Sequence, residues 1–190
     1  SLLLGGTVVT TSKLGLNPDT LLTMVEDHGV TDMVIVGDAF ARPILAALDE
    51  AEKRGTPYQI ESLKQITSSG VMWSQEIKQG LLRHQDLVLA DVMGSTEGGM
   101  GSSVMTREAT ASTAKFELNE GVAVITDDDR FVEPGSGEMG KVATSAFVPL
   151  GYYKDPEKSA ATFREVEGGR YSFPGEYATV ERDGSITLLG

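Results

Sequence analysis

The first hundred residues alternate short β-branched runs with longer amphipathic stretches, and this alternation limits the fold more than any other feature. Such runs are typical of buried strands, and apolar residues at helical spacing are typical of helices that pack on a sheet. The repeated order of strand, helix and strand favours βαβ units and a parallel sheet. The expected strands are Thr7–Thr11, Met33–Val36, Leu63–Thr67 and Leu87–Asp91.

Residues that begin helices stand between these strands. Asn17 followed by Pro18 predicts a helix cap and the first helical position. A second helix is expected over residues 38–54, which carry apolar residues on one face and basic residues in the last turn. Ser74 is expected to cap a third helix that runs to about His84.

The pattern changes from about residue 112, where short alternating segments are separated by turn residues. Val122–Thr126 is typical of a half-buried strand, and Glu133–Gly137 is typical of a turn. Three consecutive aspartates, Asp127–Asp129, lie between them. Their side chains diverge around a turn, so we interpret them as an exposed hairpin tip and not as a metal site.

These patterns predict an α/β fold. A parallel-sheet βαβ subdomain is expected over about residues 1–108, followed by a small antiparallel β-barrel-like subdomain over about residues 112–190. We therefore divide the chain into domains at residues 1–110 and 111–190. A chain of 190 residues with 40% hydrophobic residues can bury a sizeable core in such an arrangement.

Composition excludes several classes of function. The chain has no cysteine and only two histidines, His28 and His84, so a metal would be held by carboxylate oxygens. Both histidines are expected to be surface or capping groups. The net charge of −12 argues against nucleic-acid partners. No apolar run approaches the roughly 18–20 residues of a membrane span, and Ser1–Leu4 lacks the features of a signal peptide. We expect a cytoplasmic protein.

Two loops rich in glycine and hydroxyl side chains follow the third and fourth expected strands, at Ser68–Met72 and Gly94–Gly101. Ligands of open parallel sheets bind outside the carboxyl ends of the strands. Small residues let backbone amides approach a phosphate, hydroxyl groups donate to its oxygens, and the Glu97 carboxylate is a suitable ligand for Mg²⁺. Taken alone, such a loop is more often a solvated turn.

The segment Gly94-Ser95-Thr96-Glu97 resembles the Gly-x-Thr-Glu motif of the adenylate-forming superfamily, which comprises acyl-CoA synthetases, luciferases and peptide-synthetase adenylation domains. The resemblance extends over nearly all of the chain. It implies that Thr96 contacts phosphate oxygens and that Glu97 helps to hold Mg²⁺. These two residues are the catalytic candidates.

The same resemblance assigns an adenine site. Ser69–Met72 is similar to the family's Gly-Gly-Ala-Pro loop, which places Gly70, Val71 and Met72 against the adenine. Asp91 takes the place of the polar residue that hydrogen-bonds the adenine amino group. The residues that follow it complete the nucleotide-binding set: Val92, Met93, Gly94 and Ser95. Met93 replaces a ring that commonly stacks on adenine, and its thioether can fill the same slot.

Downstream segments continue the resemblance. Gly137–Gly140 and Gly151–Phe163 are similar to the family's motif of Gly-Glu, Gly-Tyr, Pro-Glu and Phe. Phe173–Glu176 is similar to the Thr-Gly-Asp motif, which makes Glu176 the ribose ligand in place of the usual Asp. Leu188 stands where the family has an apolar residue against the other face of the adenine.

Within the superfamily, the two glycine-rich loops look closest to those of acyl-CoA synthetases for long-chain fatty or sterol-derived acids. Gly98, Gly99 and Met100 would then line the acyl channel, because residues without bulk leave room for an apolar chain. The alternative is a glycine turn that binds no ligand.

The implied activity is that of an ATP-dependent acid–thiol ligase, with ATP or AMP, Mg²⁺ and CoA as cofactor, metal and co-substrate. The family's glycine-rich triphosphate loop and its C-terminal lysine domain belong to parts upstream and downstream of these motifs, so we expect an internal fragment that is inactive by itself. Two alternatives remain open. One is an adenylation domain that loads a carrier protein, and the other is a non-catalytic nucleotide-binding scaffold.

Overall fold

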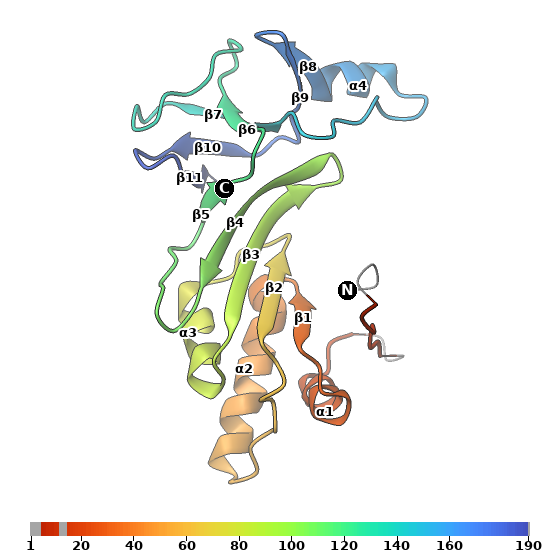
Figure 1. Cartoon of the computed structure of the whole chain (residues 1–190), viewed down its shortest axis with the longest axis vertical. Helices are drawn as coiled ribbons and strands as arrows, with labels where there is room; N and C mark the ends of the chain where they lie inside the picture. The colour runs from red at the N-terminus through yellow and green to blue at the C-terminus, as the bar shows by residue number, and fades with distance from the viewer. Residues whose placement is uncertain (1–4, 12–14, 190) are drawn as a thin grey trace. The chain divides into compact units, whose positions relative to one another are not determined.

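The computed structural model describes residues 5–11 and 15–189 of the chain (Figure 1). The chain forms two compact units: the first comprises residues 1–90 and 104–110, and the second residues 91–103 and 111–190. The division therefore does not fall at a single point near residue 110. Two long strands, β3 (Val88–Ser95) and β4 (Gly98–Met105), contribute to both units.

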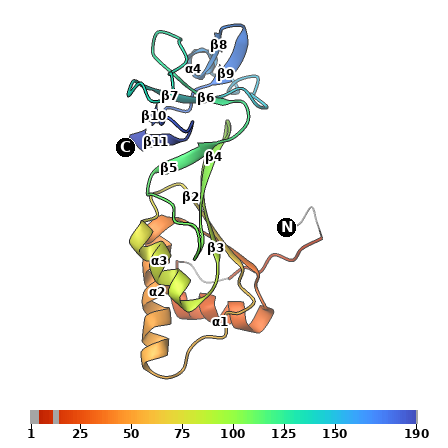
Figure 2. The same cartoon turned by 60° about the vertical axis from the view of Figure 1, so that its left-hand side comes forward.

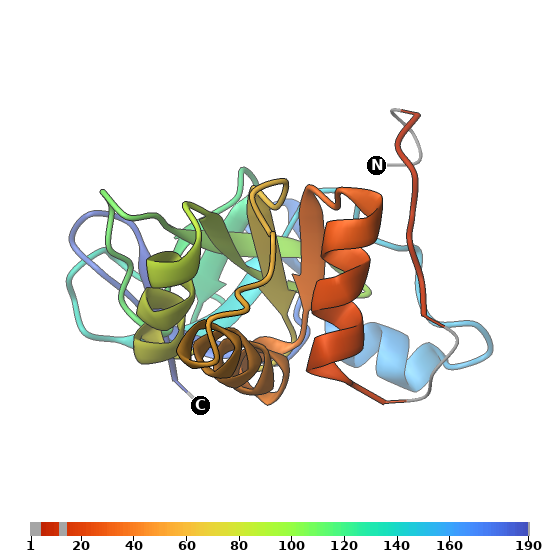
Figure 3. The ribbon, with the colours of Figure 1, turned by 90° about the horizontal axis from the view of Figure 1, so that it is seen from below.

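The first unit has α/β structure. Strands β1 (Asp32–Ile35) and β2 (Gln65–Ser69) pair in parallel with Met33 opposite Ile66. The start of β3 lies beside β2, where the Val88 N–H donates to the Lys64 carbonyl at 2.9 Å. Helix α2 contacts both of the other helices, as the view in Figure 3 shows. The helices are α1 (Pro18–His28), α2 (Gly37–Lys53) and α3 (Gln75–His84).

The helix starts follow the predicted signals with one difference. Asn17 caps α1, since its side-chain oxygen accepts from the Thr20 N–H at 2.8 Å. Ser74 is the N-cap residue of α3, as predicted, but its side chain makes no capping hydrogen bond. Its N–H and hydroxyl donate instead to Asp38 Oδ1 at the start of α2, at 2.9 and 3.1 Å.

The core of the first unit lies between its helices and strands. Helices α2 and α3 lie side by side (Figure 2), and apolar residues at helical spacing fill the space between them. Trp73 is fully buried just before α3. Other buried side chains of this unit are Leu22, Val25, Ile35, Ile44, Leu48, Ile66, Ile77, Leu81 and Leu89.

The predicted strand Thr7–Thr11 is wrong, because these residues belong to no strand. Their β-branched side chains favour an extended backbone, but a strand also needs a neighbour that accepts and donates its hydrogen bonds. Val8 and Val9 are 53% and 37% exposed, so they do not form part of the core.

The second unit is mainly antiparallel. Its strands after β4 are β5 (Lys115–Leu118), β6 (Val122–Ile125), β7 (Met139–Thr144), β8 (Phe163–Val166), β9 (Gly169–Ser172), β10 (Tyr177–Val180) and β11 (Ile186–Leu189). The short helix α4 (Pro156–Thr162) precedes β8. The spatial order of the strands is β4-β5-β11-β10-β7-β9-β8, and β6 pairs with β7 outside this order.

The sheet of the second unit is open. Among the described residues, no pairing joins β4 to β8 at the two ends of this order, so the expected barrel-like form is not closed. Its main core contains Phe116, Val142, Ala178 and Ile186, contributed by four different strands. Ile125, Ala143, Val166 and Phe173 form a second cluster. The predicted α/β fold class is confirmed, with the closure of the barrel as the correction.

The aspartates Asp127–Asp129 form a turn after β6, as predicted. Each makes an ion pair: Asp127 with Lys141 at 2.9 Å, Asp128 with Arg130 at 3.9 Å, and Asp129 with Arg164 at 3.0 Å. None of the described helices combines the length and apolarity needed to cross a membrane.

Candidate functional site

A β-hairpin carries the two catalytic candidates. Strands β3 and β4 are joined by a turn at Thr96 and Glu97, and the Glu97 N–H donates to Ser95 Oγ at 3.2 Å. The prediction of a loop over Gly94–Gly101 is therefore wrong, because most of its residues extend the two strands. Thr96 is exposed and Glu97 is half-buried, so both side chains stand at the tip of a regular element.

Glu97 is held by a residue far along the chain. The hydroxyl group of Tyr152 donates a short hydrogen bond to Glu97 Oε1. Tyr152 is itself anchored, because its N–H donates to Ser159 Oγ in α4 at 2.8 Å. The ammonium group of Lys158 lies 4.4 Å from the centre of the Tyr152 ring. The start of α4 thus supports the tyrosine that holds the carboxylate.

This arrangement keeps Glu97 ionised. The hydrogen bond from Tyr152 holds the pKa of Glu97 below its usual value, and Ser95 and Lys158 add to the effect. The same hydrogen bond raises the pKa of Tyr152, so the phenol keeps its proton and remains a donor. The hydrogen bond engages one carboxylate oxygen. A carboxylate has a second oxygen with which it can bind a cation.

Glu176 lies directly before β10. Its carbonyl oxygen accepts from the Val142 N–H at 2.8 Å, which fixes the backbone against β7. Its side-chain oxygen Oε2 is buried and has no hydrogen-bond partner among the described residues. A buried acceptor without a donor is costly, so this oxygen is suited to a hydroxyl group supplied by a ligand.

The residues of β3 point in two directions. Asp91 is 8% exposed, which is low for an acidic side chain. Met93 is 7% exposed and belongs to the main core of the second unit. Met100 on β4 is fully buried in the same core, so its side chain has no exposed surface in this structure. Val92 is half-buried and Gly94 exposed, on the opposite side of the strand from Met93.

Packing explains two glycines of β4. A Cβ atom on Gly98 would lie 2.8 Å from Thr144 Cγ2, and one on Gly101 would lie 2.6 Å from the Glu117 carbonyl oxygen. Real Cβ atoms do not approach so closely, so both positions need glycine for the contact between strands. Gly99 differs, since a Cβ there would lie 3.4 Å from Asn119 Nδ2 and the residue is exposed.

Leu188 lies in β11, opposite Ala178 of β10. It is half-buried and packs on the main core of the second unit. Its N–H donates to the Ala114 carbonyl at 3.0 Å. Part of the side chain is therefore available beyond the core.

The predicted adenine loop belongs to the first unit. Gly70 adopts a φ of 94°, and the Val71 and Met72 side chains are 53% and 69% exposed. The loop rests on the start of α2, where a Cβ on Gly37 would lie only 2.5 Å from the Met72 carbonyl oxygen. The Asp38 N–H donates to that same oxygen at 3.2 Å.

The residues that support the candidates are not evident from the sequence. The Asp38 N–H and Gly37 contact the Met72 carbonyl of the predicted adenine loop, and Tyr152 holds Glu97. A signal was present for Gly37, which follows a strand and opens a helix. Tyr152 belongs to the Gly-Tyr part of a family motif, and that motif does not specify a partner 55 residues away.

A cavity of about 410 Å³ lies in the second unit, and none of the residues predicted for the site is among its lining residues. Its lining contains Lys115 and Asp183, which form an ion pair at 2.8 Å. The other lining residues are Gly135, Gly137, Thr179, Val180, Glu181 and Arg182.

The sequence is similar to acyl-CoA ligases. It is 38% identical, over the whole chain and 35% of the relative, to a medium/long-chain-fatty-acid–CoA/3-oxocholest-4-en-26-oate–CoA ligase of Mycolicibacterium smegmatis. It is 42% identical, over 88% of the chain and 31% of the relative, to a 3-oxocholest-4-en-26-oate–CoA ligase of Rhodococcus rhodochrous. The chain spans about a third of the length of these curated relatives. No family model matches it.

Solved structures share the fold. The structure of the peptide synthetase FmoA3 superposes on this chain with a TM-score of 0.78 and 19% sequence identity. The match covers 94% of this chain and 20% of the FmoA3 chain. The long-chain-fatty-acid–CoA ligase FadD1 of Archaeoglobus fulgidus matches 91% of this chain and 36% of its own with a TM-score of 0.70 and 17% identity. The motifs around Glu97 and Glu176, the ligase relatives and the shared fold all agree. The chain therefore belongs to the adenylate-forming superfamily.

Proposed function

We propose that this chain forms part of an AMP-forming acid–thiol ligase, which activates a carboxylic acid with ATP and transfers the acyl group to CoA. The observation that carries the proposal is the identity of 38 to 42% with acid–CoA ligases over 88 to 100% of the chain. Similarity at this level to relatives of one activity supports the same reaction class. A cytoplasmic location is part of the same proposal.

The substrate class that we propose is a long-chain fatty or sterol-derived carboxylic acid. The names of the relatives specify medium- and long-chain fatty acids and a 3-oxocholestenoate. Gly98 and Gly99 are the acyl-contact candidates: Gly99 is exposed, whereas Gly98 packs against Thr144. The buried Met100 could act only by shaping the wall from behind. Specificity would then depend on the shape of the hairpin β3–β4 together with other parts of the parent protein.

Glu176 is our proposed ribose ligand. Its buried oxygen without a donor fits an ATP or AMP ribose, whose hydroxyl groups would donate to it. The adenine ring would contact Gly70, Val71 and Met72, with Asp91 as the acceptor for its amino group and Leu188 as an apolar contact. Val92, Met93, Gly94 and Ser95 would shape the strand beside the nucleotide.

Glu97 is our proposed Mg²⁺ ligand. The fit rests on chemistry: it is a hard oxygen donor, and Tyr152 keeps it ionised and oriented. A bound Mg²⁺ would supply positive charge that offsets charge on the phosphates. Thr96, exposed at the same turn, would donate its hydroxyl to a phosphate oxygen.

The reaction would proceed in two steps. A carboxylate oxygen of the acid attacks the α-phosphorus of ATP, and the bond to pyrophosphate breaks to give the acyl-adenylate. The CoA thiol then attacks the acyl carbon, loses its proton, and AMP leaves. Neither step needs a nucleophilic side chain, so the residues named here act by positioning and by electrostatics.

The full-length parent protein provides the test. Incubation with ATP, Mg²⁺, CoA and either a long-chain fatty acid or a 3-oxo-sterol carboxylate should yield AMP, pyrophosphate and the acyl-CoA. Two results would contradict the proposal: ATP consumption that yields no acyl-CoA thioester, or no ATP consumption with either acid. The residue 1–190 chain alone should give no ATP–pyrophosphate exchange, and robust turnover would refute that part.

A second candidate is an adenylation domain that loads a carrier protein. It is favoured by one observation, the similarity in fold to the peptide synthetase FmoA3, which has 19% identity to this chain and a TM-score of 0.78. Supplying the parent with both CoA and a carrier protein separates the two by the thiol that is acylated. A non-catalytic scaffold is separated from both by Glu176→Asp, which should raise nucleotide affinity only in a working site.

A further inference from the structure

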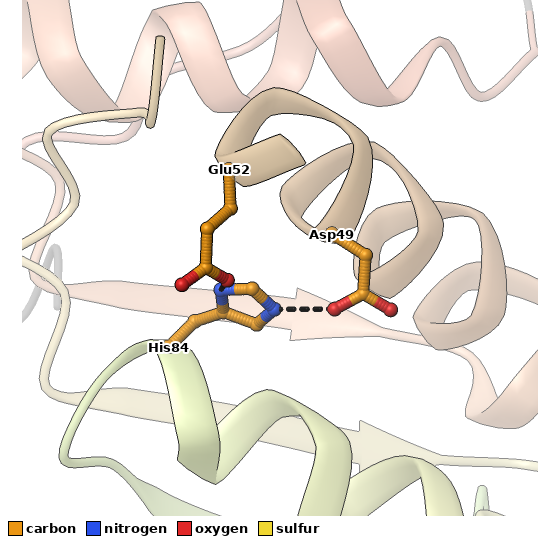
Figure 4. Close-up of side chains that lie close together, drawn as sticks. All are labelled: Asp49, Glu52 and His84. Carbon is orange, nitrogen blue, oxygen red and sulfur yellow. Dashed lines mark hydrogen bonds and ion pairs between the residues drawn. The ribbon is translucent and has the colours of Figure 1, made fainter. Parts of the chain in front are cut away.

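A cluster of three polar side chains lies in the first unit, at the C-terminal ends of two packed helices (Figure 4). Asp49 and Glu52 are three residues apart on α2, so their side chains project from one face. His84 is the last residue of α3. Candidate ligand atoms of all three side chains lie within 4.8 Å of one another. The cluster contains no residue assigned to the nucleotide or acyl site.

The imidazole of His84 lies between the two carboxylates. Its Nε2 is 2.7 Å from Asp49 Oδ1, and its Nδ1 is 3.5 Å from Glu52 Oε2. The His84 side chain is only 11% exposed. The expectation of a surface or capping histidine is therefore wrong in its surface part, because α2 covers the ring and supplies two acidic partners.

The two sides of the ring have different geometry. The 2.7 Å contact between Nε2 and Asp49 Oδ1 has the length of a charge-assisted hydrogen bond. In the tautomer that carries its proton on Nε2, this nitrogen donates to Asp49 and Nδ1 presents a lone pair towards Glu52. Two donors bound to one tetrahedral Zn²⁺ at about 2.0–2.2 Å are roughly 3.3–3.6 Å apart. The separation of 3.5 Å between Nδ1 and Oε2 falls in this range.

From this geometry we propose that His84 Nδ1 and Glu52 Oε2 bind a divalent transition-metal ion such as Zn²⁺, with Asp49 orienting the imidazole from its other side. Metal-bound histidines commonly donate their second N–H to a carboxylate, which fixes the tautomer and makes the ligand more basic. An imidazole nitrogen with carboxylate oxygen selects Zn²⁺ and related ions over Mg²⁺ and Ca²⁺. Water completes the coordination on the open side.

The surroundings favour a cation. Helices α2 and α3 end at Lys53 and His84, and the C-terminal end of a helix carries partial negative charge. Glu52 is 71% exposed, so its carboxylate can adjust to an ion.

One competing cation faces the cluster. Arg83 lies 3.4 Å from Asp49 Oδ1, but its side chain is 66% exposed and contacts the carboxylate that orients the ring, not the proposed ligand Glu52. A metal at His84 and Glu52 would connect α3 to α2 by coordinate bonds. It would therefore stabilise the first unit independently of any nucleotide.

Titration calorimetry of the full chain with ZnCl₂, in a buffer that does not bind metal, tests the proposal. Zn²⁺ should bind one site and raise the melting temperature, because it binds only the folded form. Glu52→Gln, at an exposed position, should weaken binding at least about tenfold without changing the circular dichroism spectrum, and Asp49→Asn about 10- to 100-fold. His84→Gln should abolish it.

His28→Gln is the matched control, since His28 is the other histidine and is exposed at the end of α1. It should leave the affinity unchanged. Two results would overturn the proposal. If the unaltered chain binds no Zn²⁺ up to about 1 mM, the cluster is an ion pair only. If the unaltered chain and its Glu52→Gln variant bind Zn²⁺ equally well, the ion is adventitious.

Discussion

The Tyr152 hydroxyl donates a hydrogen bond to Glu97 Oε1 and so connects the tip of the β3–β4 hairpin to the segment before α4. The contact links two motifs of the superfamily that are separated by 55 residues in the chain. Hydrogen bonds to a metal-binding carboxylate fix its orientation and tune its affinity. Tyr152 is therefore a positioning residue for Glu97 in the proposed ligase.

Replacing Tyr152 by Phe removes this hydrogen bond and keeps the ring. In the full-length parent, the Mg²⁺ concentration at half-maximal activity should rise about 10- to 100-fold, because Glu97 loses its orientation. Titrating Mg²⁺ at saturating ATP and acid measures the effect. Tyr153→Phe is the control, since Tyr153 is 88% exposed. Equal Mg²⁺ dependence of Tyr152→Phe and the unaltered protein would remove Tyr152 from the site.

Glu176 gives a prediction about nucleotide affinity. If its buried Oε2 accepts a ribose hydroxyl, Glu176→Ala should lose ~1.5–3 kcal/mol of binding free energy, which is roughly a 10- to 150-fold rise in Kd. Binding of a non-hydrolysable acyl-adenylate analogue to the full-length parent measures the Kd. Glu120→Ala, an exposed acid in a turn, should bind as the unaltered protein does. An unchanged Kd for Glu176→Ala would exclude the ribose role.

The sequence predicts local structure well where local signals decide it. Asn17 followed by Pro18 does begin a helix, and the apolar spacing of residues 38–54 does mark α2. The run Thr7–Thr11 fails because strand formation needs a partner strand, which β-branched residues do not specify. Local propensity identifies extended backbone but not its hydrogen-bond neighbours.

The candidate site shows the same limit. The motif at Thr96 and Glu97 is evident in the sequence, but the glycines around it predict a loop where the structure has a hairpin. Gly98 and Gly101 are glycines because Thr144 and Glu117 approach from strands that are distant in sequence. Likewise, the burial of His84 depends on α2, which supplies both of its acidic partners. Such requirements arise from tertiary contacts and leave no local pattern.

Gly37 allows a direct test of the support for the predicted adenine loop. Gly37→Ala places a Cβ 2.5 Å from the Met72 carbonyl oxygen at a φ of +49°, so overpacking adds to backbone strain. The free energy of unfolding should fall by about 1–3 kcal/mol more than in the control. The control is Gly55→Ala, which has a φ of +73° and no atom within 4 Å. Equal urea midpoints for the two variants would show that the contact with Met72 is unimportant.

Asp38 connects the start of α2 to the start of α3 and should give the chain an acid-dependent stability. Burial raises the pKa of Asp38, but hydrogen bonds from the Ser74 N–H and hydroxyl, together with Arg42, outweigh burial and hold the pKa below its usual value. A folded-state pKa below the unfolded one means that the stability is present above about pH 4 and is lost as pH falls through the folded value. Asp38→Asn should therefore lower the melting temperature at neutral pH and lose less stability than the unaltered chain on going below about pH 4. Melting curves across this range measure both effects, with Asp27→Asn, an exposed acid of α1, as the control. Parallel acid profiles for Asp38→Asn and the unaltered chain would show that Asp38 does not couple α2 to α3.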